Sequence, residues 1–230
     1  SVIAIVANFV DMGTFGDFMI NYSYIFHFVT ALGMVTLFMF VDFNTISPGA
    51  NDNLTGTYAA VCALRMLDMA GVDFENTEVC AMITDGEEAG LRGCKSWAKN
   101  HYDEYVNSGV ETVVLCVDTL TDREYLRVYN KDMTGTVKNN QQFSQLVMDA
   151  SKDAGHDDIE LSSVFFGSSD AAAFSQAGIT ATCLAAMDPR PADYYHNRRD
   201  TADRLVPETI KTGFDVIIST ILNFDEKGLN

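Results

Sequence analysis

The hexapeptide Pro48-Gly49-Ala50-Asn51-Asp52-Asn53 decides how this chain is organised, because it stands between an apolar run and a long helical pattern. Proline and glycine favour a sharp bend at this point. The bend delivers the carboxylate of Asp52 where a strand is predicted to end and a helix to begin. In open α/β sheets, the ends of strands are where binding sites form.

Further acidic and imidazole groups occupy comparable positions. Glu87 and Glu88 follow one apolar run, Asp118 ends the next, and His196 lies in a loop that follows the last predicted strand. Asp, Glu and neutral His together are a ligand set that suits zinc. Taken from the residues alone, plainer interpretations stay open: a helix N-cap for Asp52, first-turn acids for Glu87 and Glu88, a strand-end turn for Asp118 and a surface imidazole for His196.

Strand and helix patterns alternate after residue 34, which is typical of an α/β fold with helices on both faces of a largely parallel sheet. No internal repeat or linker interrupts the chain, so residues 1–230 are expected to form a single domain. We expect helices at residues 53–71, 88–106, 139–154, 169–177 and 208–224. We expect strands at residues 1–8, 77–83, 110–117, 125–130, 159–165 and 179–186.

One apolar run, residues 18–41, contains no acidic or basic residue. Its length would allow a membrane-spanning helix, which is the alternative interpretation. Its flanks, Asp17 and Asp42, are acidic rather than basic, and apolar residues alternate with polar ones in its first half. We therefore expect two strands, at about 19–29 and 34–41, and no insertion into a membrane.

The composition argues against some classes of partner. The chain is 47% apolar and 20% charged, as is ordinary for a folded soluble protein. Its net charge of −17 argues against binding to nucleic acid or to an anionic membrane. Its five cysteines are scattered without a C-x-x-C pair, which suggests reduced thiols and a cytosolic setting.

These segments resemble the M28 zinc aminopeptidases. The chain matches the family's P-G-A-[ND]-D/N segment at Asp52, its D-x-E-E-x-G-L-x-G segment at residues 85–93, its strand-end Asp at Asp118 and its Y-H-x-x-x-D-T segment at His196. Order and spacing fit from about Ala50 to Leu222. The resemblance implies a three-layer α/β/α sandwich around a mixed, largely parallel sheet of about eight strands.

The resemblance also implies a role for each of these residues. Asp52, Glu88 and His196 would hold a first zinc ion, and Asp52 would bridge to a second ion held by Asp118. The bond after Asp52 is expected to be cis. Glu87 would be the general base, which takes a proton from metal-bound water and passes it to the leaving amine. The substrate would be a peptide that loses its N-terminal residue.

Four further residues would support this site. Asp42 and Asp200 would act from behind the metal ligands, Asp200 by orienting its loop or the imidazole within it. Tyr195 and Asp170 would line the substrate side of the cleft. Many family members are exported, so the cellular location stays open between cytosol and export, and the oligomeric state is not predicted.

One ligand of the family is missing. The family has an H-x-D segment before the bridging Asp, and here the place is taken by Phe40-Val41-Asp42. Phe40 cannot bind zinc, so three outcomes stay open: a one-zinc enzyme, a weak second ion, or an impaired relative that acts as a binding module. Glutaminyl cyclases, which share the fold and use one zinc, are the alternative enzyme class.

Overall fold

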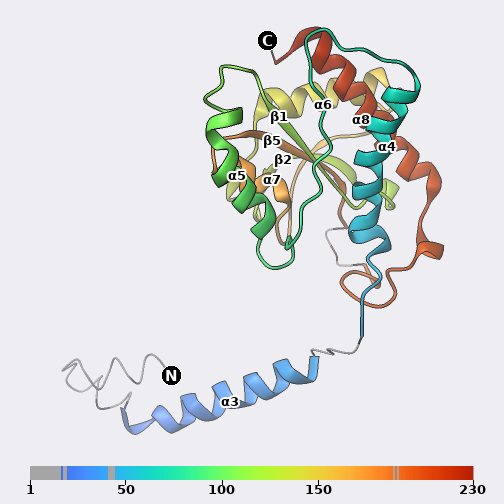
Figure 1. Ribbon diagram of the computed structural model, residues 1–230. Helices are drawn as coiled ribbons and strands as arrows, with labels where there is room; N and C mark the ends of the chain where they lie inside the picture. Colours follow the sequence, from blue (N-terminus) through green and yellow to red (C-terminus); the bar gives the residue numbers. More distant parts are fainter. Residues whose placement is uncertain (1–16, 18–19, 41–44, 189, 191, 230) are drawn as a thin grey trace. The chain divides into compact units, whose positions relative to one another are not determined.

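Figure 1 shows a computed structural model of the chain, which describes residues 17, 20–40, 45–188, 190 and 192–229. The chain divides into two compact units, Ser1–Ile46 and Ser47–Asn230. The strand expected at residues 1–8 and the acid Asp42 lie outside the described residues.

The larger unit is built on a mixed five-stranded sheet. Its strands are β1 (Val113–Asp118), β2 (Leu126–Asp132), β3 (Val137–Lys138), β4 (Leu161–Ser163) and β5 (Thr180–Ala186). The order is β1-β5-β2-β3, with β4 also pairing with β2. The β1–β5 and β2–β4 pairs are parallel, whereas β2 runs antiparallel to β5 and β3. The described strands are fewer than the eight expected.

Helices cover both faces of this sheet (Figure 1). The helices are α4 (Gly56–Met69), α5 (Arg92–Tyr105), α6 (Gln141–Asp153), α7 (Asp170–Gln176) and α8 (Pro207–Lys227), with short turns η1 (Ala50–Thr55), η2 (Arg123–Tyr125) and η3 (Ala202–Arg204). Along β5, Leu184 and Ala186 pack with α4, α6 and α8, whereas Cys183 and Ala185 pack with α5 and α7. Successive side chains of a strand point to opposite faces, so this alternation makes three layers. The predicted α/β/α sandwich is confirmed.

Residues 77–83 do not form the expected strand. They run extended, and Thr77, Val79 and Ala81 are half-buried while Glu78 and Cys80 are exposed, but they pair with no described strand. The apolar run fits a strand by composition, yet a strand exists only through the backbone partners that it finds. The outer edge of β1 therefore ends the described sheet.

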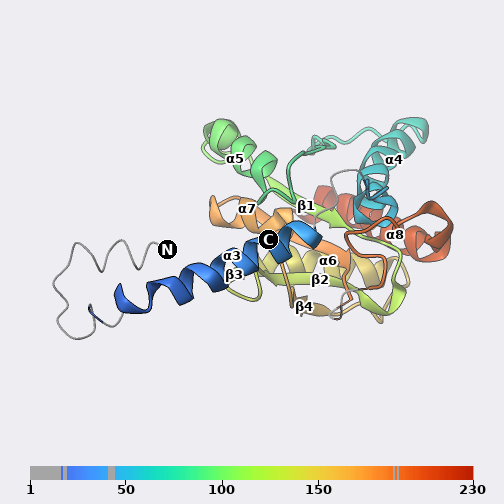
Figure 2. The same cartoon turned by 90° about the horizontal axis from the view of Figure 1, so that it is seen from below.

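The two strands expected within residues 18–41 are also wrong. Residues Ser23–Phe40 form one continuous helix, α3, shown in Figures 1 and 2. A helix satisfies its backbone hydrogen bonds within one segment, whereas an alternating pattern needs a neighbouring strand. The side chains of Tyr24, Phe28 and Leu37 are 65%, 70% and 65% exposed. Among the described residues, no helix combines the length and the apolar character needed to cross a membrane.

Candidate metal centre

Asp52 lies in the tight turn η1, which joins a bend at Gly49 to helix α4. The backbone angles of Asp52 and Asn53 are not helical, and the peptide bond between them is cis, as expected. Gly49 has a φ of 66°, and a Cβ atom there would lie 2.8 Å from the carbonyl oxygen of Asp52. Glycine is therefore the residue that this bend requires.

The carboxylate of Asp200 anchors the same turn. It accepts hydrogen bonds from the backbone N–H groups of Asn51 at 2.8 Å and Asp52 at 2.9 Å. The backbone carbonyl of Asp200 accepts a third, from Ala50, at 3.2 Å. Asp200 is only 1% exposed. Asp200 was expected to orient its own loop or the imidazole within it, whereas these contacts hold a different segment, the turn that carries Asp52.

The imidazole of His196 meets two of the acids. Its Nε2 atom lies 3.1 Å from Oδ2 of Asp52 and 2.8 Å from Oε1 of Glu88. One ligand atom from each of the three residues lies within 4.8 Å of the other two. His196 has a φ of 54°, a conformation uncommon outside glycine. Three distant parts of the chain thus bring their side chains to one point.

The ring of Tyr195 lies flat against the ring of His196. Their centroids are 3.7 Å apart and their planes differ by 21°. Burial, followed by the nearby charges of Asp52 and Glu88, raises the pKa of the Tyr195 hydroxyl. Tyr195 therefore stays protonated at neutral pH, and its ring limits the positions that the imidazole can take.

Glu87 and Glu88 lie in a turn rather than in the first turn of a helix. The helix expected from residue 88 begins at Arg92, because Gly90 and Leu91 have φ values of 93° and 59° that a right-handed helix excludes. Burial is the largest cause that raises the pKa of Glu87, to about 7, and the charges of Glu88, Asp170 and Asp52 add to it. A carboxylate with this pKa suits proton transfer near neutral pH.

Asp118 is the last residue of β1 and faces the same acids. Its Oδ1 atom is buried and has no hydrogen-bond partner. Burial, followed by the charges of Asp52 and Glu87, raises the pKa of Asp118 well above its usual value. Asp118 does not belong to the group of three whose ligand atoms lie within 4.8 Å. A cation between Asp118 and Asp52 would offset both the cost of burying the Asp118 charge and the repulsion between the two carboxylates.

Asp170 enters the site from the start of α7. Its Oδ2 atom accepts a hydrogen bond from the Thr84 hydroxyl at 2.9 Å, while Oδ1 is buried without a partner. The preceding Ser169 is held by the fully buried carboxylate of Asp132, which accepts its N–H at 2.9 Å and its hydroxyl at 2.5 Å. These hydrogen bonds fix Ser169, which precedes α7, and thereby the start of the helix that carries Asp170.

Sequence reasoning missed the two asparagines that flank Asp52. The Oδ1 atom of Asn51 accepts hydrogen bonds from the N–H groups of Leu120 at 3.0 Å and Thr121 at 3.1 Å. Its Nδ2 group donates to the Tyr194 hydroxyl at 3.2 Å, and that hydroxyl donates to Asp122. Asn51 is buried. The sequence did contain a signal for these bonds: Asp52 has a primary amide on each side, and an amide can donate and accept hydrogen bonds at once.

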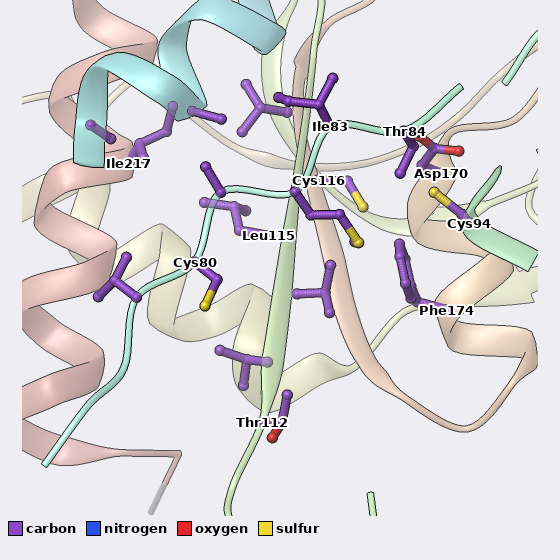
Figure 3. A pocket seen from close by; sticks show the side chains of 18 of the residues that line it. Cys80, Ile83, Thr84, Cys94, Thr112, Leu115, Cys116, Asp170, Phe174 and Ile217 are labelled. Carbon is purple, nitrogen blue, oxygen red and sulfur yellow. Dashed lines mark hydrogen bonds between the residues drawn. The ribbon is translucent and has the colours of Figure 1, made fainter. Parts of the chain in front are cut away.

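A cavity of about 730 Å³ adjoins the acids. It follows β1 from Thr112 towards the level of Thr84 and Asp170, as Figure 3 shows. The unpaired segment at residues 76–84 forms one wall, from which Cys80 and Ile83 extend (Figure 3). Apolar side chains of α4, α8 and α5 complete the lining.

The donor set fits zinc at one position. Asp52, Glu88 and His196 offer two carboxylates and an imidazole, which matches the three protein ligands of a catalytic zinc. The Oδ1 atom of Asp118 is buried without a hydrogen-bond partner, but Asp118 lies outside this group of three. Phe40, which stands in the sequence where the family has a ligand histidine, is the last residue of α3.

The sequence model of peptidase family M28 matches residues 34–221. The chain belongs to this family. The match includes every described site residue named above, from Asp52 to Asp200.

Individual relatives agree with this membership. The aminopeptidase YwaD of Bacillus subtilis (strain 168) is 27% identical over 194 residues, which are 76% of this chain and 37% of YwaD. An aminopeptidase from Aneurinibacillus sp. strain AM-1 has a similar structure, with a TM-score of 0.63, 22% identity and coverage of 76% of this chain and 39% of that one. The zinc aminopeptidase BSAP of Bacillus subtilis gives a TM-score of 0.55, 23% identity and coverage of 76% and 42%. The chain thus spans less than half of the length of these relatives.

Proposed function

We propose that this M28 family member is a zinc-dependent aminopeptidase, which hydrolyses the N-terminal residue from peptides. The observation that carries the proposal is the convergence of Asp52, Glu88 and His196 within 4.8 Å, beside a Glu87 carboxyl whose pKa is raised to about 7. Family membership and the aminopeptidase relatives support the same activity.

Asp52, Glu88 and His196 are the residues that would hold the zinc ion. When bound there, zinc would polarise the scissile carbonyl and lower the pKa of an attacking water. Glu87 accepts the proton of that water and returns a proton to the leaving amine, a transfer that its raised pKa favours near neutral pH.

Three other residues shape the reaction from the side of the protein. Asp200 keeps Asp52 in place through the backbone of η1. Tyr195 holds the imidazole of His196 by stacking. Asp170 lines the cavity together with Glu87, and its carboxylate suits the free α-ammonium group of a peptide.

The site would take a second cation at Asp118, next to Asp52. Two carboxylates alone are a thin ligand set for zinc, so we expect this second ion to bind more weakly than the first. Water molecules would complete its coordination.

The experiment combines zinc analysis with turnover of aminoacyl p-nitroanilides and their N-acetyl counterparts. We expect the protein to retain zinc and to cleave only the substrates with a free amine. Glu87→Gln should lower turnover by about 100-fold or more while zinc is retained. The exposed Glu160 provides a matched control, because Glu160→Gln removes the same charge from a residue that does not line the cavity.

Three other results would each contradict a part of the proposal. Loss of zinc in Glu87→Gln contradicts the assignment of Glu87 as the base. Cyclisation of a peptide that begins with glutamine, with no hydrolysis, replaces the peptidase by a cyclase. Retained zinc without turnover of any peptide identifies a binding module.

A further inference from the structure

The side chain of Asn53 grips the backbone on both sides of Asp118. Its Nδ2 group donates to the carbonyl oxygen of Val117 at 2.9 Å, and its Oδ1 atom accepts the N–H of Thr119 at 3.2 Å. The same Oδ1 atom accepts the N–H of Gly56 at 3.0 Å. At the end of β1, the amide of Asn53 thus makes the backbone hydrogen bonds that a neighbouring strand would otherwise make.

Gly56 allows this grip by letting helix α4 approach β1. A Cβ atom at Gly56 would lie 2.3 Å from the carbonyl oxygen of Val117 and 2.6 Å from Oδ1 of Asn53. Neither atom can move far, because one is backbone and the other is held by hydrogen bonds. Any side chain at residue 56 would therefore push the start of α4 away from the end of β1.

The turn after Asp118 needs such support. Thr119 has a φ of 39°, which is strained for a β-branched residue. Strained backbone persists where its surroundings hold it in place. The two asparagines do so, because Asn53 holds Thr119 while Asn51 holds Leu120 and Thr121.

Asp52 and Asn53 are neighbours in sequence, so one stretch supplies one acid and holds the backbone of the other. We propose that the side chain of Asn53 is a positioning group that keeps the Asp118 carboxylate beside Asp52, and that it thereby determines whether a second cation binds. This inference rests on the proposed metallopeptidase function. It adds Asn53, and Gly56 behind it, as residues that act on the second cation without touching it.

The test is a calorimetric titration of the metal-free protein with Zn²⁺ alone, which gives one dissociation constant for each ion. Asn53→Ala removes the grip without adding a charge near the cation, as aspartate would. Gly56→Ala breaks the same contact from the other side, by displacing α4. Outer residues of metal sites typically change affinity by about 10- to 100-fold, and we expect that loss for the second ion in both variants. The dissociation constant of the first ion should change by less than about threefold, because Asp118 is not one of its ligands.

Asn139→Ala is the matched control. Asn139 is buried, donates to the carbonyl oxygen of Tyr129 at 2.7 Å and accepts from the Ser175 hydroxyl at 2.7 Å, in a position remote from the acids. It should lower the thermal midpoint as much as Asn53→Ala does, yet leave both zinc constants unchanged. A purely structural role of Asn53 would weaken both ions together.

Three results overturn the inference. In the first, Asn53→Ala and Gly56→Ala leave the dissociation constant of the second ion unchanged. In the second, the wild-type chain binds one ion only, which leaves a one-zinc peptidase intact. In the third, the chain binds no zinc at all, which also overturns the proposed function.

Discussion

The carboxylate of Asp200 accepts the backbone N–H of Asp52 at 2.9 Å, across 148 residues of sequence. This bond fixes Asp52 through its backbone and uses neither of its carboxylate oxygens. Asp200 is buried, so its charge is stabilised mainly by the N–H groups that it accepts. The loop that carries His196 is therefore held directly against the turn that carries Asp52.

Asp200→Asn should weaken zinc binding. The amide keeps one acceptor and turns an N–H₂ group towards one of the two backbone donors, so one charge-assisted hydrogen bond is lost. We expect about a 10- to 100-fold rise in the zinc dissociation constant and a loss of about 1.5–3 kcal/mol in stability. Competition with a chromophoric chelator measures the first, and urea unfolding the second. Asp203→Asn, at an exposed position in the same loop, should change neither; equal effects of both variants would contradict the role of Asp200.

Tyr195 should act on the metal through its ring. Tyr195→Ala removes the stack against His196, and such ring contacts contribute about 0.5–1.5 kcal/mol, so zinc should bind about 2- to 10-fold more weakly. Tyr195→Phe keeps the ring and should bind zinc as the wild type does. If Tyr195→Phe weakens zinc as much as Tyr195→Ala, the hydroxyl rather than the stack is responsible.

The stability of the metal-free protein should fall as pH rises from about 4.5 to about 7. Glu87 has its pKa raised from 4.5 to about 7 in the folded chain, so across this window the folded state binds more protons than the unfolded state, and stability decreases with pH. Glu87→Gln removes the part of this dependence that Glu87 contributes. Because Glu87 is only about half-buried, we discount the effect for solvent screening and expect the variant to gain about 1–2 kcal/mol relative to wild type between pH 4.5 and pH 8.

Urea unfolding in the presence of a chelator, at both pH values, measures this gain. Glu160→Gln serves as its control, because that carboxyl is exposed. A constant difference between wild type and Glu87→Gln at the two pH values would show that Glu87 does not carry the raised pKa.

Asp170→Asn should weaken the binding of free amines. Asp170 lines the cavity together with Glu87, and a hydrogen bond between charged groups contributes about 1.5–3 kcal/mol, so L-leucinamide should bind about 10- to 100-fold more weakly. N-acetyl-L-leucinamide should be unaffected, because it has no ammonium group. Calorimetry with both compounds distinguishes the two cases, and Asp149→Asn on α6 is an exposed control. Equal binding of L-leucinamide to Asp170→Asn and wild type would remove Asp170 from the amine site.

Local sequence patterns predicted part of this molecule and missed the rest for a physical reason. Asp52, Glu88 and His196 belong to short motifs, and these three predicted ligands do converge. The helices α4, α6, α7 and α8 follow local periodicity and lie close to their predicted bounds. Local patterns say nothing about partners, so the strands expected at residues 19–29, 34–41 and 77–83 were wrong: a strand depends on a neighbour that its own residues do not specify.

The same reason explains what was missed at the site. The hydrogen bonds of Asn53 join residues 64 and 66 positions apart. Nothing in the spacing around residue 53 announces them. The helix predicted from residue 88 failed more locally, because Leu91 adopts a positive φ that leucine rarely takes.

The bond between Asp200 and Asp52 also orders events during synthesis. A ribosome releases the segment around Asp52 long before the segment around Asp200, so a nascent chain carries the first acid without its anchor or its imidazole partner. The arrangement of Asp52 beside His196 can therefore assemble only after the segment that carries Asp200 has been synthesised.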